Sequence, residues 1–381
     1  MAITTIFTNR FYSAVAVLMG GVIGVGIFGV PFVFAKAGFL TGFFFLIGLT
    51  FLVLTINLAY GEVILRTDKP HQLVGYADIY LGDFAKKITF FAFVLGIYSA
   101  LLAYIVVAGE FLTNIVSLKF YFSPTALGTL FFTAGAIAVA AGFKTVTKID
   151  FWAVLFYVAA VLGVSIWGLP HLDFSNFDLF HKEFWFLPYG VILFALTGMS
   201  SIVLQREVLE GKEFLLKKSI WWGTLLPAVI YLLLALVVVG ISGEATSTEA
   251  VAGLLPFLGQ KIIILGSLFG LVAMFTSFVN LSRVLQESFA FDWHLPKFWA
   301  WFFALFPPFL IFLFGVRDFI NIIGLAGSLS IGLLSIIFIL IYGKVKKLGH
   351  RIPEYSLNFP RWFWYLAMLL FSIGVVLALI K

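Results

Sequence analysis

The groups in this sequence best placed to do chemistry lie on the backbone of a glycine-rich segment. Residues 20–31 read Gly-Gly-Val-Ile-Gly-Val-Gly-Ile-Phe-Gly-Val-Pro, with five glycines and one proline in twelve residues. Inside a helix each glycine costs about 1 kcal/mol and a proline about 3 kcal/mol. If the helix unwinds here, freed N–H groups of the outer half can hold a carboxylate. Freed carbonyls of the inner half can hold an ammonium or an alkali ion.

A glycine face for close helix packing is the alternative. It accounts for Gly20-x-x-x-Gly24 but leaves the other three glycines and the proline unexplained. We therefore predict a break in this helix, in mid-membrane.

Two further segments carry small and hydroxyl residues. Phe194 to Ser201 gives a weaker break signal, for which tight packing with hydroxyls bonded back to the helix is an equal alternative. Ala273, Thr276, Ser277 and Asn280 fall on one helix face by their spacing. Their hydroxyls, with freed carbonyls, suit a hard cation, and a polar packing seam stays an open alternative.

Other chemistries find little support. The absence of cysteine excludes disulfides, thiolate catalysis and Cys-ligated zinc. All five histidines (His71, His171, His181, His294 and His350) lie between apolar runs or at their edges. Gly21-x-x-Gly24-x-Gly26 follows no strand, so a dinucleotide loop is rejected. We expect neither an enzyme nor a bound cofactor.

Charged residues inside the apolar runs are rare. Glu110 is the one well inside a run, and it is either a proton carrier or, as we favour, part of a water-filled outer vestibule. It points about 120° away from Tyr104 on the same helix. Glu62 and Arg66 are spaced for a helix-end ion pair. Arg206 and Glu207 suit a cytoplasmic gate, although plain interfacial charges are the simpler interpretation.

The elements that position these residues are apolar helices. The chain is 62% hydrophobic and 11% charged, against roughly 25% charged in soluble domains. Runs long enough to span a bilayer lie near 11–35, 39–65, 88–117, 124–143, 150–169, 185–205, 219–241, 260–283, 298–315, 318–342 and 361–380. We predict an all-α integral membrane protein with about 11 transmembrane helices.

The basic residues predict its orientation. Eighteen of the 24 Lys and Arg residues fall in one set of alternating loops. The positive-inside rule places that set and the N-terminus in the cytoplasm, and the C-terminus outside. The same rule explains the net charge of +6 without nucleic-acid binding.

The runs divide into two blocks of equal length within a single membrane domain, 1–381. The first block is 11–169 and the second is 184–342, and 361–380 forms an extra C-terminal helix. Because each block holds five helices, the second must be inverted.

These segments resemble the amino acid–polyamine–organocation transporter superfamily. Within it they are most similar to the amino acid/auxin permeases and the bacterial aromatic amino acid permeases. The resemblance is spread over nearly the whole chain and rests on residues 20–31 with 35–38, 58–67, 98–105, 194–201 and 276–292. It implies a LeuT-like fold, a five-plus-five inverted repeat with discontinuous helices 1 and 6.

The resemblance also implies the binding residues. The substrate carboxylate would lie near the amides of Val25 and Gly26, and its ammonium near carbonyls at Val22 and around helix 6. The implied substrate site comprises Val22, Gly24, Val25, Gly26, Tyr104, Phe194, Ala195, Thr197 and Gly198. The implied Na⁺ site comprises Gly20, Ile23, Ala273, Thr276 and Ser277.

The coupling ion stays open. Gly20 stands where sodium-coupled eukaryotic relatives carry an asparagine, which removes a side-chain oxygen. Residues 151–169 carry no charge, whereas some proton-coupled relatives place a lysine in that helix.

We therefore expect a plasma-membrane permease that carries amino acids with Na⁺ or H⁺ by alternating access. A non-transporting sensor or channel on the same scaffold is the alternative. The expected partners are an amino acid and the lipid bilayer, with no nucleic acid. The 47 phenylalanines fill packing and lipid-facing positions and do not specify the substrate. The sequence does not specify the oligomeric state.

Overall fold

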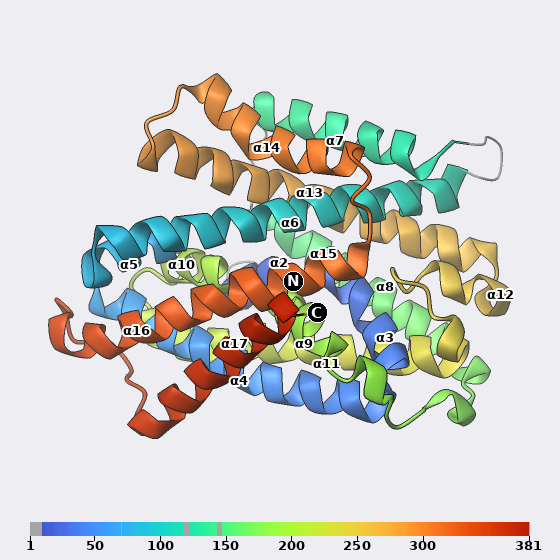
Figure 1. The fold of residues 1–381 in the computed structure, drawn as a ribbon, viewed down its shortest axis with the longest axis horizontal. Helices are drawn as coiled ribbons and strands as arrows, with labels where there is room; N and C mark the ends of the chain where they lie inside the picture. Colours follow the sequence, from blue (N-terminus) through green and yellow to red (C-terminus); the bar gives the residue numbers. More distant parts are fainter. Residues whose placement is uncertain (1–9, 70, 117–121, 143–146, 381) are drawn as a thin grey trace, which may run out of the picture.

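The computed structural model describes residues 10–69, 71–116, 122–142 and 147–380, and every regular element among them is helical. Most long helices run roughly along the longest axis of the molecule (Figure 1). The described long helices, apart from those that break, are α4 (Phe39–Arg66), α6 (Asp83–Val116), α7 (Pro124–Ala140), α8 (Thr147–Gly168), α11 (Leu216–Ser242), α13 (Gln260–Asp292), α14 (Lys297–Leu313), α16 (Gly332–Leu348) and α17 (Arg361–Ile380).

The predicted break in the first helix is confirmed. Helix α2 (Arg10–Val22) and helix α3 (Gly26–Ala37) are separated by three residues, with a bend of 59° between them. The glycines provide both the low helix propensity and the room for close neighbours, so the packing interpretation and the break are not exclusive. A Cβ at Gly21, for example, would lie 1.9 Å from the Ser201 hydroxyl oxygen.

The sixth predicted helix is also interrupted, although less strongly. Helix α9 (Leu187–Ala195) ends before Leu196, and α10 (Met199–Val208) begins after Gly198. Gly198 has the non-helical dihedral angles φ −152° and ψ 17°. Residues 187–208 still form one apolar span of 22 residues, without the sharp bend of the first pair.

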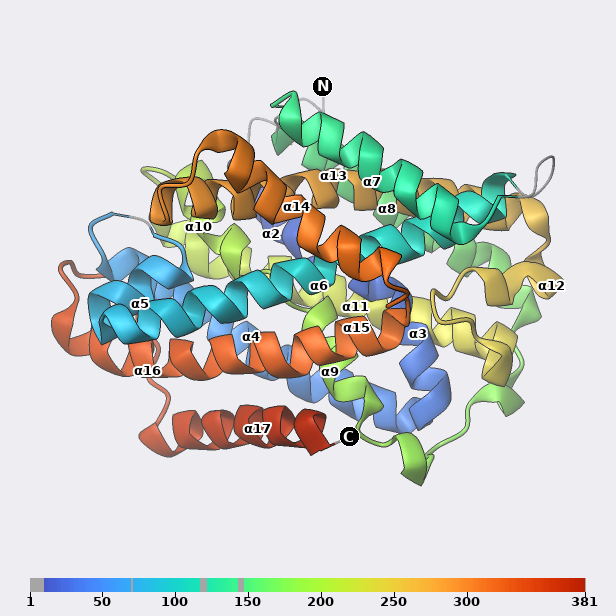
Figure 2. The ribbon, with the colours of Figure 1, turned by 45° about the horizontal axis from the view of Figure 1, so that its top comes forward.

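Each of the eleven predicted apolar runs overlaps a helix. By length and composition, seven helices of the described residues qualify as membrane spans, or eight with the bent pair, and three shorter apolar helices accompany them. The count of eleven spans therefore stays a prediction. Helix α17 lies at the edge of the bundle beside α16 (Figure 2).

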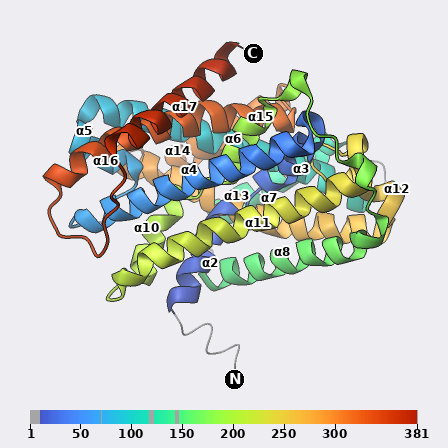
Figure 3. The same cartoon turned by 90° about the horizontal axis from the view of Figure 1, so that it is seen from below.

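The two interrupted helices lie inside a scaffold. Helix α2 packs on α10 and α11, and α3 packs on α9 and α11. Helices α6 and α13 pack on each other. Seen from below, α2, α4, α8 and α11 share one face of the molecule (Figure 3). The breaks are thus held between long continuous helices.

Helix α12 (Leu255–Leu258) and several 3-10 turns fall between the predicted runs, and two further elements were not predicted. Helix α5 (Leu73–Leu81) is a short helix between α4 and α6. Ala326–Ile331 is a π-helical turn between α15 (Phe319–Leu325) and α16. A Cβ on Gly327 in this turn would lie only 1.8 Å from the Gly190 carbonyl oxygen. The turn therefore lets α9 approach it backbone to backbone.

The segment 349–360, which we call the strap, joins α16 to α17 and docks on the end of α4. The fully buried Glu62 pairs with Arg66 at 2.8 Å, as predicted. Its carboxylate also accepts hydrogen bonds from Tyr342, Ser356 and the Leu357 amide, at 2.7–2.8 Å. Glu62 therefore anchors the strap as well as its own helix end.

Candidate functional site

The two breaks cross in direct contact. A Cβ on Gly26, the first residue of α3, would lie 2.7 Å from the Cα of Ala195, the last residue of α9. A Cβ on Gly198, just before α10, would lie 2.4 Å from a methyl group of Val22, the last residue of α2. Only glycine fits at these two crossing points without displacement of a neighbour.

Tyr104 of α6 contacts the first break. Its hydroxyl is hydrogen-bonded to the backbone of Val25 and to Ser277 of α13. It would lie 2.6 Å from a Cβ on Gly24. The tyrosine therefore meets the amide at which a substrate carboxylate is predicted to bind.

Tyr231 of α11 contacts the backbone at both breaks. Its hydroxyl lies 2.9 Å from the carbonyl oxygen of Val22 and 3.0 Å from that of Ala195. The side chain is fully buried. Sequence reasoning missed this residue, because a tyrosine inside an apolar run carries no motif. A phenol in mid-span, which needs a polar partner, was the only available signal.

A cavity of about 470 Å³ leads to the first break. This volume lies in the range of small-molecule sites. Tyr104 and all five residues of the predicted Na⁺ site line it. The full lining is Val17, Gly20, Gly21, Ile23, Gln72, Tyr104, Ser200, Ser201, Leu204, Glu207, Val208, Ala273, Thr276, Ser277, Asn280, Leu281, Arg283, Val284 and Glu287.

The cavity wall carries polar groups in two regions. In its interior, the Thr276 hydroxyl donates to the Ala273 carbonyl at 2.9 Å and keeps its lone pairs for another partner. Toward α5 and the last turns of α10 and α13, the lining carries Glu207 and the ion pair Arg283–Glu287 at 3.1 Å. The wall therefore offers oxygen ligands inside and charges of both signs nearer the ends of these helices.

Most of the predicted substrate residues lie off this wall. Tyr104 lines the cavity, whereas Val22, Gly24, Val25, Gly26, Phe194, Ala195, Thr197 and Gly198 are not part of its lining. Two of these residues are hydrogen-bonded to each other, since the Thr197 amide donates to the Phe194 carbonyl at 3.2 Å. The Thr197 hydroxyl bonds back to Leu193 at 2.8 Å. The crossing of the breaks is thus closed to the cavity in this conformation.

Glu110 lies away from the cavity. Its exposed side chain interacts electrostatically with Glu249, in the segment after α11. Among the described residues, no group of three or more His, Asp or Glu side chains is arranged to hold a metal ion.

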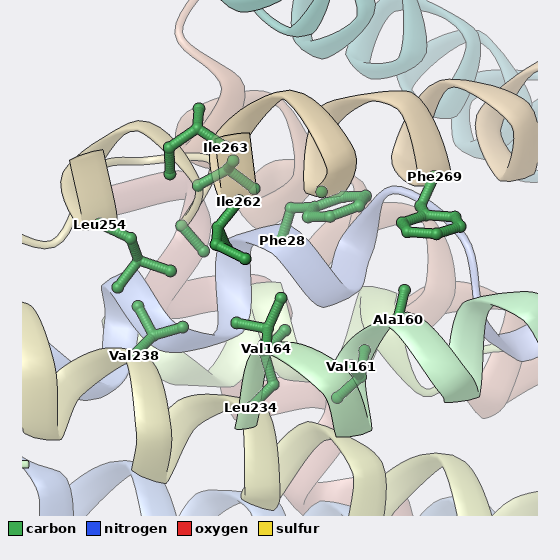
Figure 4. A pocket seen from close by; sticks show the side chains of 13 residues that line it. Phe28, Ala160, Val161, Val164, Leu234, Val238, Leu254, Ile262, Ile263 and Phe269 are labelled. Carbon is green, nitrogen blue, oxygen red and sulfur yellow. The ribbon is translucent and has the colours of Figure 1, made fainter. Parts of the chain in front are cut away.

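A second, much smaller cavity lies beside Phe28 of α3 (Figure 4). Its volume is about 50 Å³, and side chains of α8, α11 and α13 surround it, among them Val161, Leu234 and Ile262. Its lining is almost wholly apolar. It has no groups that recognise an amino or carboxyl group.

Paired helix breaks inside an apolar helical bundle, with a cavity leading to them, define a multi-pass membrane transporter of the LeuT-like fold. A family model covers nearly the whole chain, residues 7–381, and the chain belongs to the tryptophan/tyrosine permease family. It is therefore an amino acid permease and not an enzyme.

One solved structure with the same fold is MhsT in complex with L-phenylalanine. It matches with a TM-score of 0.69 and 17% sequence identity, over 97% of this chain and 97% of that chain. No curated protein matches the sequence significantly. The predicted likeness to aromatic amino acid permeases is confirmed by the family, and membership of the wider superfamily stays a prediction.

Proposed function

We propose that the protein is a secondary active transporter of aromatic amino acids, which it carries with a cation by alternating access. The family name and the phenylalanine bound to the similar MhsT structure support the substrate class. The observation that carries the proposal is the crossing of two helix breaks beside Tyr104, a residue that also lines the cavity of about 470 Å³.

The crossing offers complementary groups for an amino acid. The amino-terminal end of α3 carries partial positive charge and suits a carboxylate, with the amides of Val25 and Gly26 as donors. The carboxyl-terminal ends of α2 and α9 carry partial negative charge and suit an ammonium, near Val22 and Ala195. Both poles lie within one crossing, which matches the short distance between the charges of an amino acid.

The cation would bind on the cavity wall. Carbonyls of Gly20, Ile23 and Ala273, with the hydroxyls of Thr276 and Ser277, form a set of neutral oxygens suited to an alkali ion. The basic-residue pattern places the end of the bundle with α5 and the strap in the cytoplasm. The conformation described here would then be open to the cytoplasm.

Uptake into proteoliposomes tests the proposal. We expect saturable accumulation of labelled L-tryptophan, L-tyrosine or L-phenylalanine when either a Na⁺ gradient or a pH gradient is imposed alone. Protein-free liposomes and a gradient of K⁺ alone are the controls. Ion current without saturable amino acid flux would instead identify a channel, and absence of both binding and uptake would exclude the proposed function.

A further inference from the structure

Two helix ends meet at a single side-chain hydroxyl. The carbonyl oxygens of Val22 and Ala195 both lie within hydrogen-bond distance of the Tyr231 hydroxyl, at 2.9 and 3.0 Å. Each carbonyl belongs to the last residue of its helix. In a continuous helix, the amide four residues further along the chain would donate a hydrogen bond to this carbonyl. Here that amide belongs to the next helix, beyond the break.

This arrangement places like charges together. The carboxyl-terminal end of a helix carries roughly half a negative elementary charge, and here two such ends converge in an apolar bundle. A donor between them relieves the repulsion. A phenol has one proton, so at any instant it fully serves one carbonyl and only partly serves the other.

The scaffold fixes the hydroxyl in this place. Two turns before Tyr231 on α11, a Cβ on Gly223 would lie 2.8 Å from the Leu18 side chain of α2. Helices α2 and α11 therefore approach closely along a face that ends at Val22. The fully buried tyrosine has little freedom to leave this position while α2 stays docked.

We propose that Tyr231 is a positioning residue that clasps the two broken helices together at their carboxyl-terminal ends. The clasp holds the inner half α2 against α9 in the conformation described here. Because α2 and α10 line the cavity, the strength of the clasp sets how widely the cavity opens. Its role in transport rests on the function proposed above, whereas its effect on the cavity does not.

Alkylation of one introduced cysteine tests the clasp, because the natural chain has none. Leu204→Cys lies on the cavity wall at a position that is 48% exposed. In this background we compare Tyr231→Phe with Tyr189→Phe. Tyr189 is the matched control, since its buried hydroxyl has no hydrogen-bond partner among the residues that the structure describes. The readout is the maleimide labelling rate of purified protein, with and without L-tryptophan.

We expect Tyr231→Phe to label roughly three- to tenfold faster than the parent, the range that one interhelical hydrogen bond in a membrane supports. Tyr189→Phe should label like the parent. An unchanged or slower rate in Tyr231→Phe overturns the clasp. If L-tryptophan alters labelling of the parent while the two variants label alike, the clasp fails and the proposed function survives. If no amino acid affects labelling of the parent but the two variants label at different rates, the clasp survives and the proposed function fails.

Should Tyr231→Phe fail to fold, 3-fluorotyrosine at position 231 replaces it. Fluorination makes the phenol a stronger hydrogen-bond donor without removing it. Slower labelling at Leu204→Cys than in the parent supports the clasp, and an unchanged rate overturns it.

Discussion

Thr276 and Ser277 lie on the cavity wall because α13 presents them on one face, as their spacing predicts. Thr276 tests the proposed ion site. Thr276→Ala removes a neutral oxygen that an alkali ion would use, so the apparent ion affinity should fall on the order of tenfold. The measurement is ion-driven uptake of labelled L-tryptophan as a function of ion concentration.

The control is Thr133→Ala on α7. Its exposed hydroxyl also bonds to its own helix, at 2.8 Å from the Thr129 carbonyl oxygen, and it does not line the cavity. Equal ion dependence in the two variants would contradict the proposed site.

At the scale of residues, sequence reasoning succeeded where chemistry leaves a local pattern. The glycines and proline of residues 20–31 indicated the break. The spacing of Ala273, Thr276, Ser277 and Asn280 indicated one helix face, and all four residues line the cavity, while the cation site stays a prediction. Tyr231 escaped because its role depends on two carbonyls that lie 209 and 36 residues away in the chain. Such a contact exists only after the helices have packed.

Among the elements, the strap depends most on one side chain. In the parent, the Glu62 carboxylate accepts hydrogen bonds from Tyr342 and from the Leu357 amide. Glu62→Gln would place an amide nitrogen, itself a donor, against such donors. Removing one partner of a buried ion pair costs about 3–5 kcal/mol. We expect a lower unfolding temperature and faster trypsin cleavage at Arg351 within the strap.

The control for this prediction is Asp83→Asn. It removes an ion pair with Lys87 at 2.7 Å that both partners expose to solvent. Exposed pairs of this kind contribute at most about 1 kcal/mol. Cleavage at Arg351 that is equally slow in the parent, Glu62→Gln and Asp83→Asn would show that Glu62 does not hold the strap.

The elements themselves were predictable to the extent that composition controls them. Long apolar runs and helix-breaking residues gave the helices and the first break. The π-helical turn at Ala326–Ile331 was not predictable, because it packs against the backbone of Gly190, which is distant in the sequence. Helix α5 was not predictable for another reason: its nine residues are too few to show a clear apolar period.

For the whole molecule, the orientation in the membrane is the open prediction. The positive-inside rule places Lys212 in the cytoplasm and Glu244 outside. Both residues are exposed, Lys212 in a loop and Glu244 in a 3-10 turn, Gly243–Ala245. Lys212→Cys should react with a membrane-impermeant maleimide only after permeabilisation of the cells, and Glu244→Cys should react in intact cells. The opposite pattern would reverse the orientation and the assignment of the cavity to the cytoplasm.

The fold as a whole followed from the resemblance more than from physical reasoning on the residues. Equal block lengths suggested two repeats, and the division at 11–169 and 184–342 stays a prediction. The sequence could not predict that most of the proposed substrate residues lie off the cavity wall, because their accessibility depends on the conformation of the helices.

The central claim is that the crossing of the two breaks binds the amino acid. Equilibrium binding of labelled L-tryptophan to purified Gly26→Ala tests it most directly. The added methyl group would lie 2.7 Å from the backbone of Ala195, so we expect the affinity for L-tryptophan to fall by at least about tenfold. Gly48→Ala on α4, where no atom lies within 4 Å of the new methyl group, should bind like the parent. Unchanged affinity in a folded Gly26→Ala protein would contradict the claim.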